Sequence, residues 1–186
     1  MNAEEKLKRI NASGRLHRIV RQSLPALVES GELLDRKVIR MRKIADDAAA
    51  VIGPFTPCAK GCSACCHNPA LISEVEAMVI AQATGANLAS PKRIFDVAAG
   101  EAARREYFSP YAGVACTFLK DGACSIYKDR PMVCRVQHSI ESSPAGCDGG
   151  RQPASVDLTE IFLADLRMMG RMMIYADIRE FFPPQG

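Results

Sequence analysis

Apolar residues recur every three or four positions along much of the chain, and this pattern predicts amphipathic helices. Residues 13–31 carry the first pattern, with Ser13 in an N-cap position, Pro25 as a kink or restart, and Gly31 at the end. Residues 32–51 carry the second pattern. We therefore expect a helical hairpin near the start of the chain.

Further helices are predicted from capping signals and periodicity. Ser73 and Glu76 have the spacing of a capping box, which predicts a helix that continues to about residue 84. The Ser-Pro pair at 90–91 predicts another helix that reaches about residue 107. The apolar stripe of residues 156–181 predicts one long helix near the end of the chain.

One segment in the middle of the chain has the pattern of a β-hairpin. Residues 114–119 indicate a short strand, Asp121-Gly122 is a strong turn signal, and residues 123–127 indicate the returning strand. Cys116 and Cys124 are then expected to face each other. The patterns together predict a mainly α (α+β) fold, in which a helical bundle surrounds a cysteine-rich metal-binding core with a small β-hairpin.

The length of 186 residues suits one domain, with an appendage. We expect a basic helical hairpin at 1–53 as that appendage, a cysteine-rich metal-binding core at 54–151, and a C-terminal helix at 152–186 that packs on the core. Prolines and glycines surround the first cysteines, and such a composition predicts a rigid loop at 54–70.

The positive charge of the chain lies at its start. Residues 1–43 hold eleven Lys and Arg against five Asp and Glu, whereas the net charge of the whole chain is only +3. This end is a candidate surface for an acidic protein partner, although a pair of solvated helix faces is the commoner explanation. The absence of Trp and an aromatic content of 6% make nucleic acid an unlikely ligand.

The first residues are charged and no apolar run approaches the roughly 20 residues of a membrane span, so we expect a cytoplasmic protein with no membrane segment. Thiols are kept reduced in the cytoplasm, which favours metal ligation over a disulfide framework. The metal ion is accordingly the expected partner of the cysteines.

The candidate metal ligands are all of the cysteines in the chain. They are Cys58, Cys62, Cys65, Cys66, Cys116, Cys124, Cys134 and Cys147. Thiolate is a soft ligand that suits zinc, Cu(I) and iron–sulfur clusters. Only Cys62 and Cys65 have the C-x2-C spacing of a zinc ribbon, whereas closely spaced loop cysteines joined by a distant one favour an iron–sulfur (Fe–S) cluster or iron, with zinc as the alternative. Which cysteines share a metal stays open.

Other side chains near the cysteines have less specific signals. His67 and His138 are candidate additional ligands, although a lone histidine more often serves in ordinary hydrogen bonding. Three arginines could bond to thiolates or to an anionic substrate, or could balance the charge of the site. They are Arg130, Arg135 and Arg151. The methionines of residues 168–173 suit either Cu(I) or core packing, and packing is favoured.

Two family resemblances concern the cysteines. The spacing Cys58-x3-Cys62-x2-Cys65 weakly resembles the loop of radical S-adenosylmethionine enzymes, but the strands of their barrel are missing. Residues 58–151 resemble the YkgJ-type CxxCxxCC family of zinc- or iron-chelating proteins more specifically. The segments that carry this resemblance are Cys62-x2-Cys65-Cys66, Cys116-x-Phe118-Leu119, Cys124-Ser125-Ile126-Tyr127, Arg130-Pro131-x2-Cys134-Arg135 and Gly146-Cys147 with Arg151.

Three hypotheses follow for the function. The first is a metal-binding protein that chelates iron or zinc through the eight cysteines. The second is a metal-dependent enzyme for redox or group-transfer chemistry, which predicts an open metal position or a cleft lined by Arg135, His138 and Tyr127. The third is a structural zinc module whose basic helical hairpin binds a partner.

Overall fold

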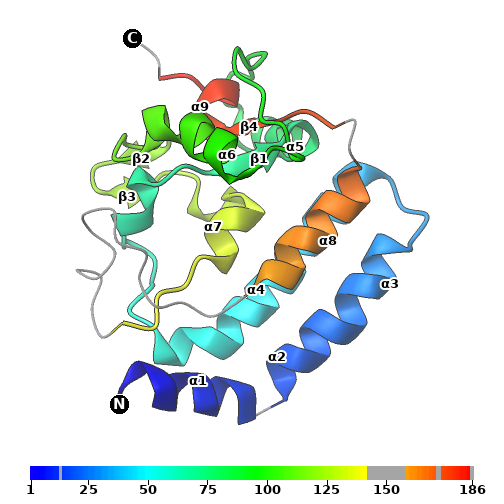
Figure 1. The fold of residues 1–186 in the computed structure, drawn as a ribbon, viewed down its shortest axis with the longest axis vertical. Helices are drawn as coiled ribbons and strands as arrows, with labels where there is room; N and C mark the ends of the chain where they lie inside the picture. The colour runs from blue at the N-terminus through cyan, green and yellow to red at the C-terminus, as the bar shows by residue number, and fades with distance from the viewer. Residues whose placement is uncertain (13, 142–157, 171–172, 185–186) are drawn as a thin grey trace.

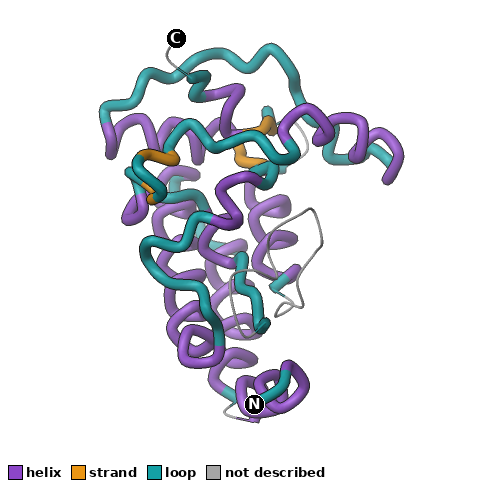
Figure 2. The backbone as a smooth tube through the Cα atoms, turned by 90° about the vertical axis from the view of Figure 1, so that its left-hand side faces the viewer, coloured by secondary structure: helices purple, strands orange, loops and turns teal. Residues whose placement is uncertain are grey.

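Long helices form a bundle, and short strands, short helices and loops lie across one end of it (Figure 1). The computed structural model describes residues 1–12, 14–141, 158–170 and 173–184. The side view shows the bundle narrowing toward the N-terminus, with the C-terminus at the opposite end (Figure 2). The observed fold is mainly α with small two-stranded sheets, which confirms the predicted fold class.

The first helical segment is longer and more divided than its periodicity predicts. An unpredicted helix α1 (Ala3–Ala12) precedes α2 (Arg15–Arg18), η1 (Ile19–Ser23) and α3 (Leu24–Val28). The wide π-type turn of η1 leads directly into Pro25, so the predicted restart at this proline is confirmed. The α-helix ends at Val28, before Gly31, and Ser13 lies outside the described residues.

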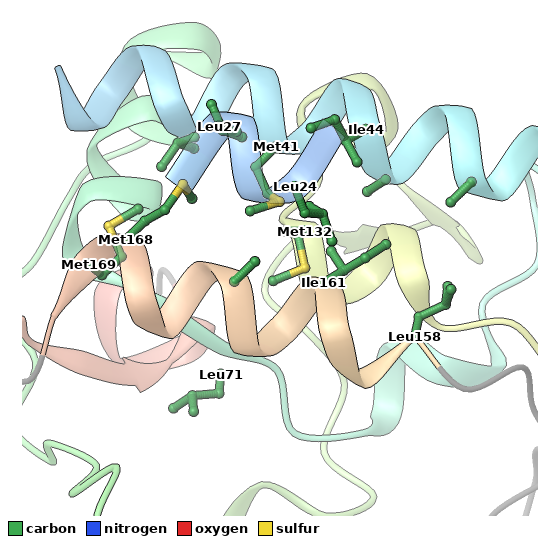
Figure 3. Packing of buried hydrophobic residues seen from close by; sticks show 14 of the residues in the cluster. Leu24, Leu27, Met41, Ile44, Leu71, Met132, Leu158, Ile161, Met168 and Met169 are labelled. Carbon is green, nitrogen blue, oxygen red and sulfur yellow. The ribbon is translucent and has the colours of Figure 1, made fainter. Parts of the chain in front are cut away.

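Helix α4 (Leu34–Ile52) is the centre of the bundle and confirms the second predicted helix. It contacts α3, α5 (Glu74–Thr84), α7 (Met132–Val136) and α8 (Thr159–Met169). Its buried stripe includes Met41, which lies in the same core cluster as Met132 and Met168 of other helices (Figure 3). Met168 and Met169 are buried among aliphatic side chains, which supports core packing over a copper site; Met172 lies outside the described residues.

A small sheet joins two distant parts of the chain above the bundle. Strand β1 (Leu71–Ser73) pairs antiparallel with β4 (Tyr175–Asp177), with Ile72 opposite Ala176. Helix α5 (Glu74–Thr84) begins directly after β1, where the Ser73 hydroxyl accepts the Glu76 amide hydrogen. The predicted cap and helix end are therefore confirmed.

The single C-terminal helix predicted for residues 156–181 is wrong. The described part contains α8 (Thr159–Met169), β4 and the short α9 (Ile178–Phe181). The break lies at Gly170, whose φ of 74° no helix accommodates. Strand β4 is then stabilised by pairing with β1, a contact that periodicity along one segment cannot reveal.

The helix predicted for residues 91–107 is also shorter than expected. Only α6 (Glu101–Phe108), followed by the turn η4 (Ser109–Tyr111), is helical. The preceding backbone bonds elsewhere: the Phe95 amide donates to the Tyr175 carbonyl at 2.7 Å, and the Asp96 carboxylate accepts from the Ala98 amide at 2.8 Å. Side-chain and tertiary hydrogen bonds thus replace the first turns of the expected helix.

The predicted hairpin exists but is smaller than its pattern indicates. Strand β2 (Leu119–Lys120) and β3 (Ala123–Cys124) flank Asp121-Gly122, and both turn residues have positive φ, as an Asp-Gly turn requires. Cys124 lies opposite Leu119, so the expectation that it faces Cys116 is wrong. The Cys116 amide instead donates to the Cys66 carbonyl at 2.8 Å, which withdraws it from the ladder.

The larger hydrophobic cluster includes Ile10, Met132 and Ile161, one from each predicted part, and the three-part division itself stays a prediction. Among the described residues, the helices are too short or too polar to cross a bilayer.

Some of the basic charge near the N-terminus is used inside the molecule. The Lys6 ammonium donates to the carbonyls of Ile140 and Glu141 at 2.8 and 2.9 Å, and thereby joins α1 to the segment after α7 (Met132–Val136). The Lys37 ammonium donates to the Val28 carbonyl at 2.9 Å. These lysines therefore serve packing as well as surface charge.

A buried ion pair fixes the loops on either side of the small sheet. The Arg179 guanidinium donates to both carboxylate oxygens of Asp177, at 2.9 and 3.1 Å, and the two side chains are almost fully buried. Asp177 also accepts the Ala70 amide hydrogen at 2.8 Å, and its own amide donates to the Tyr107 hydroxyl at 2.9 Å. The pair is therefore bonded to two other segments, at Ala70 and at Tyr107.

The remaining Arg179 hydrogens reach backbone carbonyls of two loops. Its Nη2 donates to the carbonyls of Cys66 and Asn68 at 3.4 and 3.3 Å, and to Val114 at 2.6 Å. Its Nε donates to the Ala115 carbonyl at 3.2 Å. Because a guanidinium presents its donors in a fixed plane, Arg179 sets the spacing between these loops.

A second buried charge cluster lies between α4, α5 and α8. The Glu76 carboxylate accepts from the Arg42 guanidinium at 3.3 Å and from the Met132 amide at 2.7 Å, which attaches α5 to α4 and α7. Asp165 of α8 is buried nearby, and this burial together with the negative charge of Glu76 raises its pKa to about 8. Asp165 is therefore neutral in the folded protein at neutral pH.

We predict that Arg179→Met lowers the free energy of unfolding by about 3–5 kcal/mol, because it leaves the buried Asp177 carboxylate without its cation. Urea denaturation of the reduced protein measures this change. Arg105→Met is the matched control, since Arg105 pairs with Glu101 on an exposed helix face and should change stability by at most about 0.5 kcal/mol. Equal losses in the two variants would contradict the role given to Arg179.

We predict that Asp165 makes the folded protein less stable as the pH rises. Its pKa is about 8 in the folded state and about 3.9 in the unfolded chain, so the folded state binds the extra proton between these values and stability falls across that window. Asp165→Asn removes this dependence. The difference in free energy of unfolding, variant minus parent, should therefore increase by about 1 kcal/mol or more as the pH rises from 4 to 8.

Urea denaturation at several pH values, in the same metal state, tests the prediction for Asp165. Asp47→Asn is the control, because Asp47 pairs with Lys43 at the surface of α4. If the pH profiles of Asp165→Asn and the parent run parallel, the prediction is wrong.

Candidate metal centre

Seven cysteines that are far apart in the sequence line one small cavity. It has a volume of about 90 Å³. The seven are Cys58, Cys62, Cys65, Cys66, Cys116, Cys124 and Cys134. Every one is partly exposed, none is in a disulfide, and Cys147 lies outside the described residues. The described thiols therefore gather at one place, as expected for converging ligands.

Two tight turns bring the first cysteines to the cavity. The Cys62 amide donates to the Ala59 carbonyl at 3.0 Å, and Gly61 supplies the positive φ of 97° in this turn. The short 3₁₀ helix η3 (Ala64–His67) follows and carries Cys65 and Cys66. A tight turn of this kind lets two adjacent residues line the same cavity.

The other cysteines come from the β2–β3 region and from α7. Cys116 precedes β2 and lies against η3 through its bond to Cys66. Cys124 is the last residue of β3, and Cys134 is in the middle of α7, whose first turn is bonded to Glu76. The second hydrophobic cluster, which includes Ile72, Phe118 and Ile178, packs behind these three cysteines and supports the cavity wall.

Burial disfavours the ionised form of most thiols here. It raises the pKa of Cys116 and Cys124, and it raises that of Cys134 well above its usual value. Negative charge on neighbouring cysteines adds to each of these increases. Several thiolates can therefore exist together in this cavity only when a cation compensates their charge.

Cys65 and Cys66 differ because they share a hydrogen bond. The Cys65 thiol donates to Cys66, which raises the pKa of Cys65 and lowers that of Cys66. Burial also raises the pKa of Cys65. Cys66 is therefore the thiol of this pair that ionises first.

Two arginines place positive charge near the thiols. Arg130 lines the cavity, its guanidinium lies 3.9 Å from the centre of the Tyr127 ring, and its charge favours ionisation of Cys124. Arg179 acts in the same way on Cys116. These contacts support charge balance at the site, one of the roles expected for arginine here.

The remaining sequence candidates divide between the cavity and other places. His138 and Tyr127 line the cavity, whereas His67 is exposed and is not part of its lining. Arg135 does not line it either, because its guanidinium bonds to the Asp46 carboxylate and to the carbonyls of Arg130 and Lys128. The predicted cleft therefore contains His138 and Tyr127, but the prediction that Arg135 lines it is wrong. Arg151 lies outside the described residues.

Sequence reasoning missed Arg179, which holds the backbone of the cysteine loops. No signal near residue 179 links it to cysteines so far away, because the link is a set of long-range bonds to carbonyls. It also missed a groove of about 910 Å³ beside the cavity. Phe118 and Ile126 line both spaces, so these two side chains form a common wall.

The donor chemistry of the cavity fits zinc or iron. Soft, anionic sulfur ligands suit both zinc and iron–sulfur clusters, and a cation would relieve the opposition between burial and ionisation. Among the described residues, no three or more His, Cys, Asp or Glu side chains are positioned to hold a metal ion together without rearrangement.

Comparisons with known proteins agree with this chemistry. Residues 57–149, which include every cavity-lining cysteine, match the sequence model of the CxxCxxCC family, described as a putative zinc- or iron-chelating domain. Neither the curated proteins nor the solved structures gave a match. The match covers every residue that lines the cavity except Ile178.

We predict that iodoacetamide modifies Cys66 of the metal-free, reduced protein faster than Cys65, Cys116, Cys124 or Cys134. The reason is that its pKa is lowered by the hydrogen bond from Cys65, whereas the pKa values of the other four are raised. Mass spectrometry of digests after a brief reaction at neutral pH gives the order.

Cys65→Ala provides the matched variant for this test, because it removes the hydrogen-bond donor and should slow the reaction of Cys66. Protein unfolded in urea is the control, since its cysteines should react at similar rates. An unchanged rate at Cys66 in the variant would show that the hydrogen bond does not control its reactivity.

Proposed function

Because this chain belongs to the CxxCxxCC family, we propose that it binds iron or zinc through the thiolates of the cysteine cavity. The observation that carries the proposal is the gathering of seven cysteines, from residue 58 to residue 134, around one small cavity. Such a concentration of half-buried thiols ionises together only when a cation balances the negative charge.

We propose iron, held as an iron–sulfur cluster, in preference to zinc. A cluster takes cysteine thiolates from a closely spaced loop together with more distant ones, and the first four cavity cysteines lie between residues 58 and 66. Zinc in a closed site and an iron–sulfur cluster each take four protein ligands, fewer than the cavity presents. Either centre would therefore use a subset of these thiols, or occur as two sites.

Cys147 is the eighth proposed ligand, on the evidence of the sequence and of the matched region that includes it. Ligation needs reduced thiols, in keeping with a cytoplasmic location. The exposed basic residues near the N-terminus, such as Arg18 and Arg36, are available to an acidic partner in addition to this metal chemistry.

The test is the absorption spectrum of anaerobically purified protein, with iron, zinc and acid-labile sulfide counted on the same sample. We expect a broad band near roughly 400 nm with iron and sulfide present. A colourless protein that contains zinc would show that the site is a structural zinc site and not an iron–sulfur cluster. Protein that retains neither metal, even after anaerobic reconstitution, would contradict the proposal.

The variant Cys134→Ser examines the cavity itself. It removes one sulfur ligand from α7 and should lower the bound metal per chain, or the metal affinity, by at least about tenfold. The control Val136→Ala truncates another side chain of α7, which packs against the larger hydrophobic cluster and lies outside the cavity lining, and should leave the metal content unchanged. Equal metal binding by Cys134→Ser and the parent protein would remove Cys134 from the ligand set.

A further inference from the structure

His138 has a side-chain environment that packing alone does not explain. Its side chain is buried, with 8% of the residue exposed, and it lines the cysteine cavity. Its Nε2 lies 2.9 Å from the Arg135 carbonyl oxygen, whereas its Nδ1 has no hydrogen-bond partner among the described residues. A buried nitrogen without a partner is destabilising, so its presence in a cavity lined by cysteines points to a ligand.

The carbonyl contact determines which nitrogen is available. A carbonyl oxygen only accepts, so Nε2 carries the hydrogen and Nδ1 of the neutral ring presents a lone pair. Metal-binding histidines commonly have this arrangement, in which one nitrogen donates to a carbonyl and the other binds the metal. Arg135 is itself held by Asp46, which makes its carbonyl a firm anchor for the ring.

The neighbouring residue connects His138 to a cysteine. The Ser139 amide donates to the Cys58 sulfur at 3.3 Å. This bond places Cys58 beside the segment that carries His138, although the two residues are far apart in the sequence. An N–H donor to sulfur also stabilises a thiolate, so the same segment supports a sulfur ligand and offers a nitrogen ligand.

We propose that His138 binds the metal through Nδ1 and, together with Cys58, gives the centre mixed imidazole and thiolate ligation. This inference rests on the proposed function, because it requires a metal in the cysteine cavity. An imidazole ligand is neutral, so a site in which it takes the place of one thiolate carries less negative charge. The other described histidines do not qualify, since His67 and His17 are exposed and lie outside the cavity lining.

X-ray absorption at the edge of the bound metal, zinc or iron, tests the proposal in the purified holoprotein. Sulfur ligands give a shell near about 2.3 Å for zinc, and an imidazole adds nitrogen near about 2.0–2.1 Å with outer-shell scattering from the ring. We expect the ring scattering in the parent protein and in the control His67→Ala, and its loss in His138→Ala. We also expect His138→Ala to bind metal at least about tenfold more weakly.

Histidine-selective ¹⁵N spectra of the parent protein give a second measurement that does not depend on whether the variant folds. Addition of zinc alone to the reduced protein should shift the Nδ1 resonance of one buried histidine and leave its Nε2 as a hydrogen-bonded N–H. The resonances of the exposed His67 and His17 should not change when zinc is added.

The outcomes separate the two proposals. Sulfur scattering without any imidazole contribution, or ring scattering that persists in His138→Ala, would overturn the role of His138 while leaving the cysteine site in place. A holoprotein without sulfur ligands, or without metal, would overturn the proposed function and this inference with it.

Discussion

The buried pair of Asp177 and Arg179 is the interaction on which the arrangement of the cysteine loops depends. Charges are costly to bury, and the pair is stable here because its donors and acceptors are satisfied by one another and by backbone groups. The bonds of Arg179 to backbone carbonyls join α9 to the loops that carry Cys66 and Cys116. The ion pair therefore constrains the geometry of the site, because the hydrogen bonds that Arg179 donates to backbone carbonyls fix the positions of the loops.

The cavity combines a low-dielectric surrounding with groups that ligate metal only when they are ionised. The apolar cluster behind Cys116, Cys124 and Cys134 excludes water and keeps these thiols protonated when no cation is present. The charges of Arg130 and Arg179 only partly offset this effect. Metal affinity in such a site depends on proton release, so binding and pH are coupled.

Local features were predictable from the sequence, and long-range ones were not. The Ser73 cap, the turn at Asp121-Gly122 and the extent of α4 depend on neighbouring residues, and all were confirmed. Strand β4 exists because of its pairing with β1, which no local pattern encodes. Cysteine chemistry identified the thiols that line the cavity. The difference between His67 and His138 could not be read from the sequence, because burial and the contact with the Arg135 carbonyl distinguish them only in the folded chain.

The distance along the chain between Cys66 and Arg179 has a consequence for biosynthesis. Their contact spans 113 positions, so Arg179 leaves the ribosome well after Cys66. At roughly 5–20 residues per second, Cys66 emerges about 6–23 seconds before the arginine that positions its loop. During that interval the nascent chain presents accessible thiols without their final geometry. A metal ion that arrived before Arg179 had emerged would therefore meet an incompletely formed site.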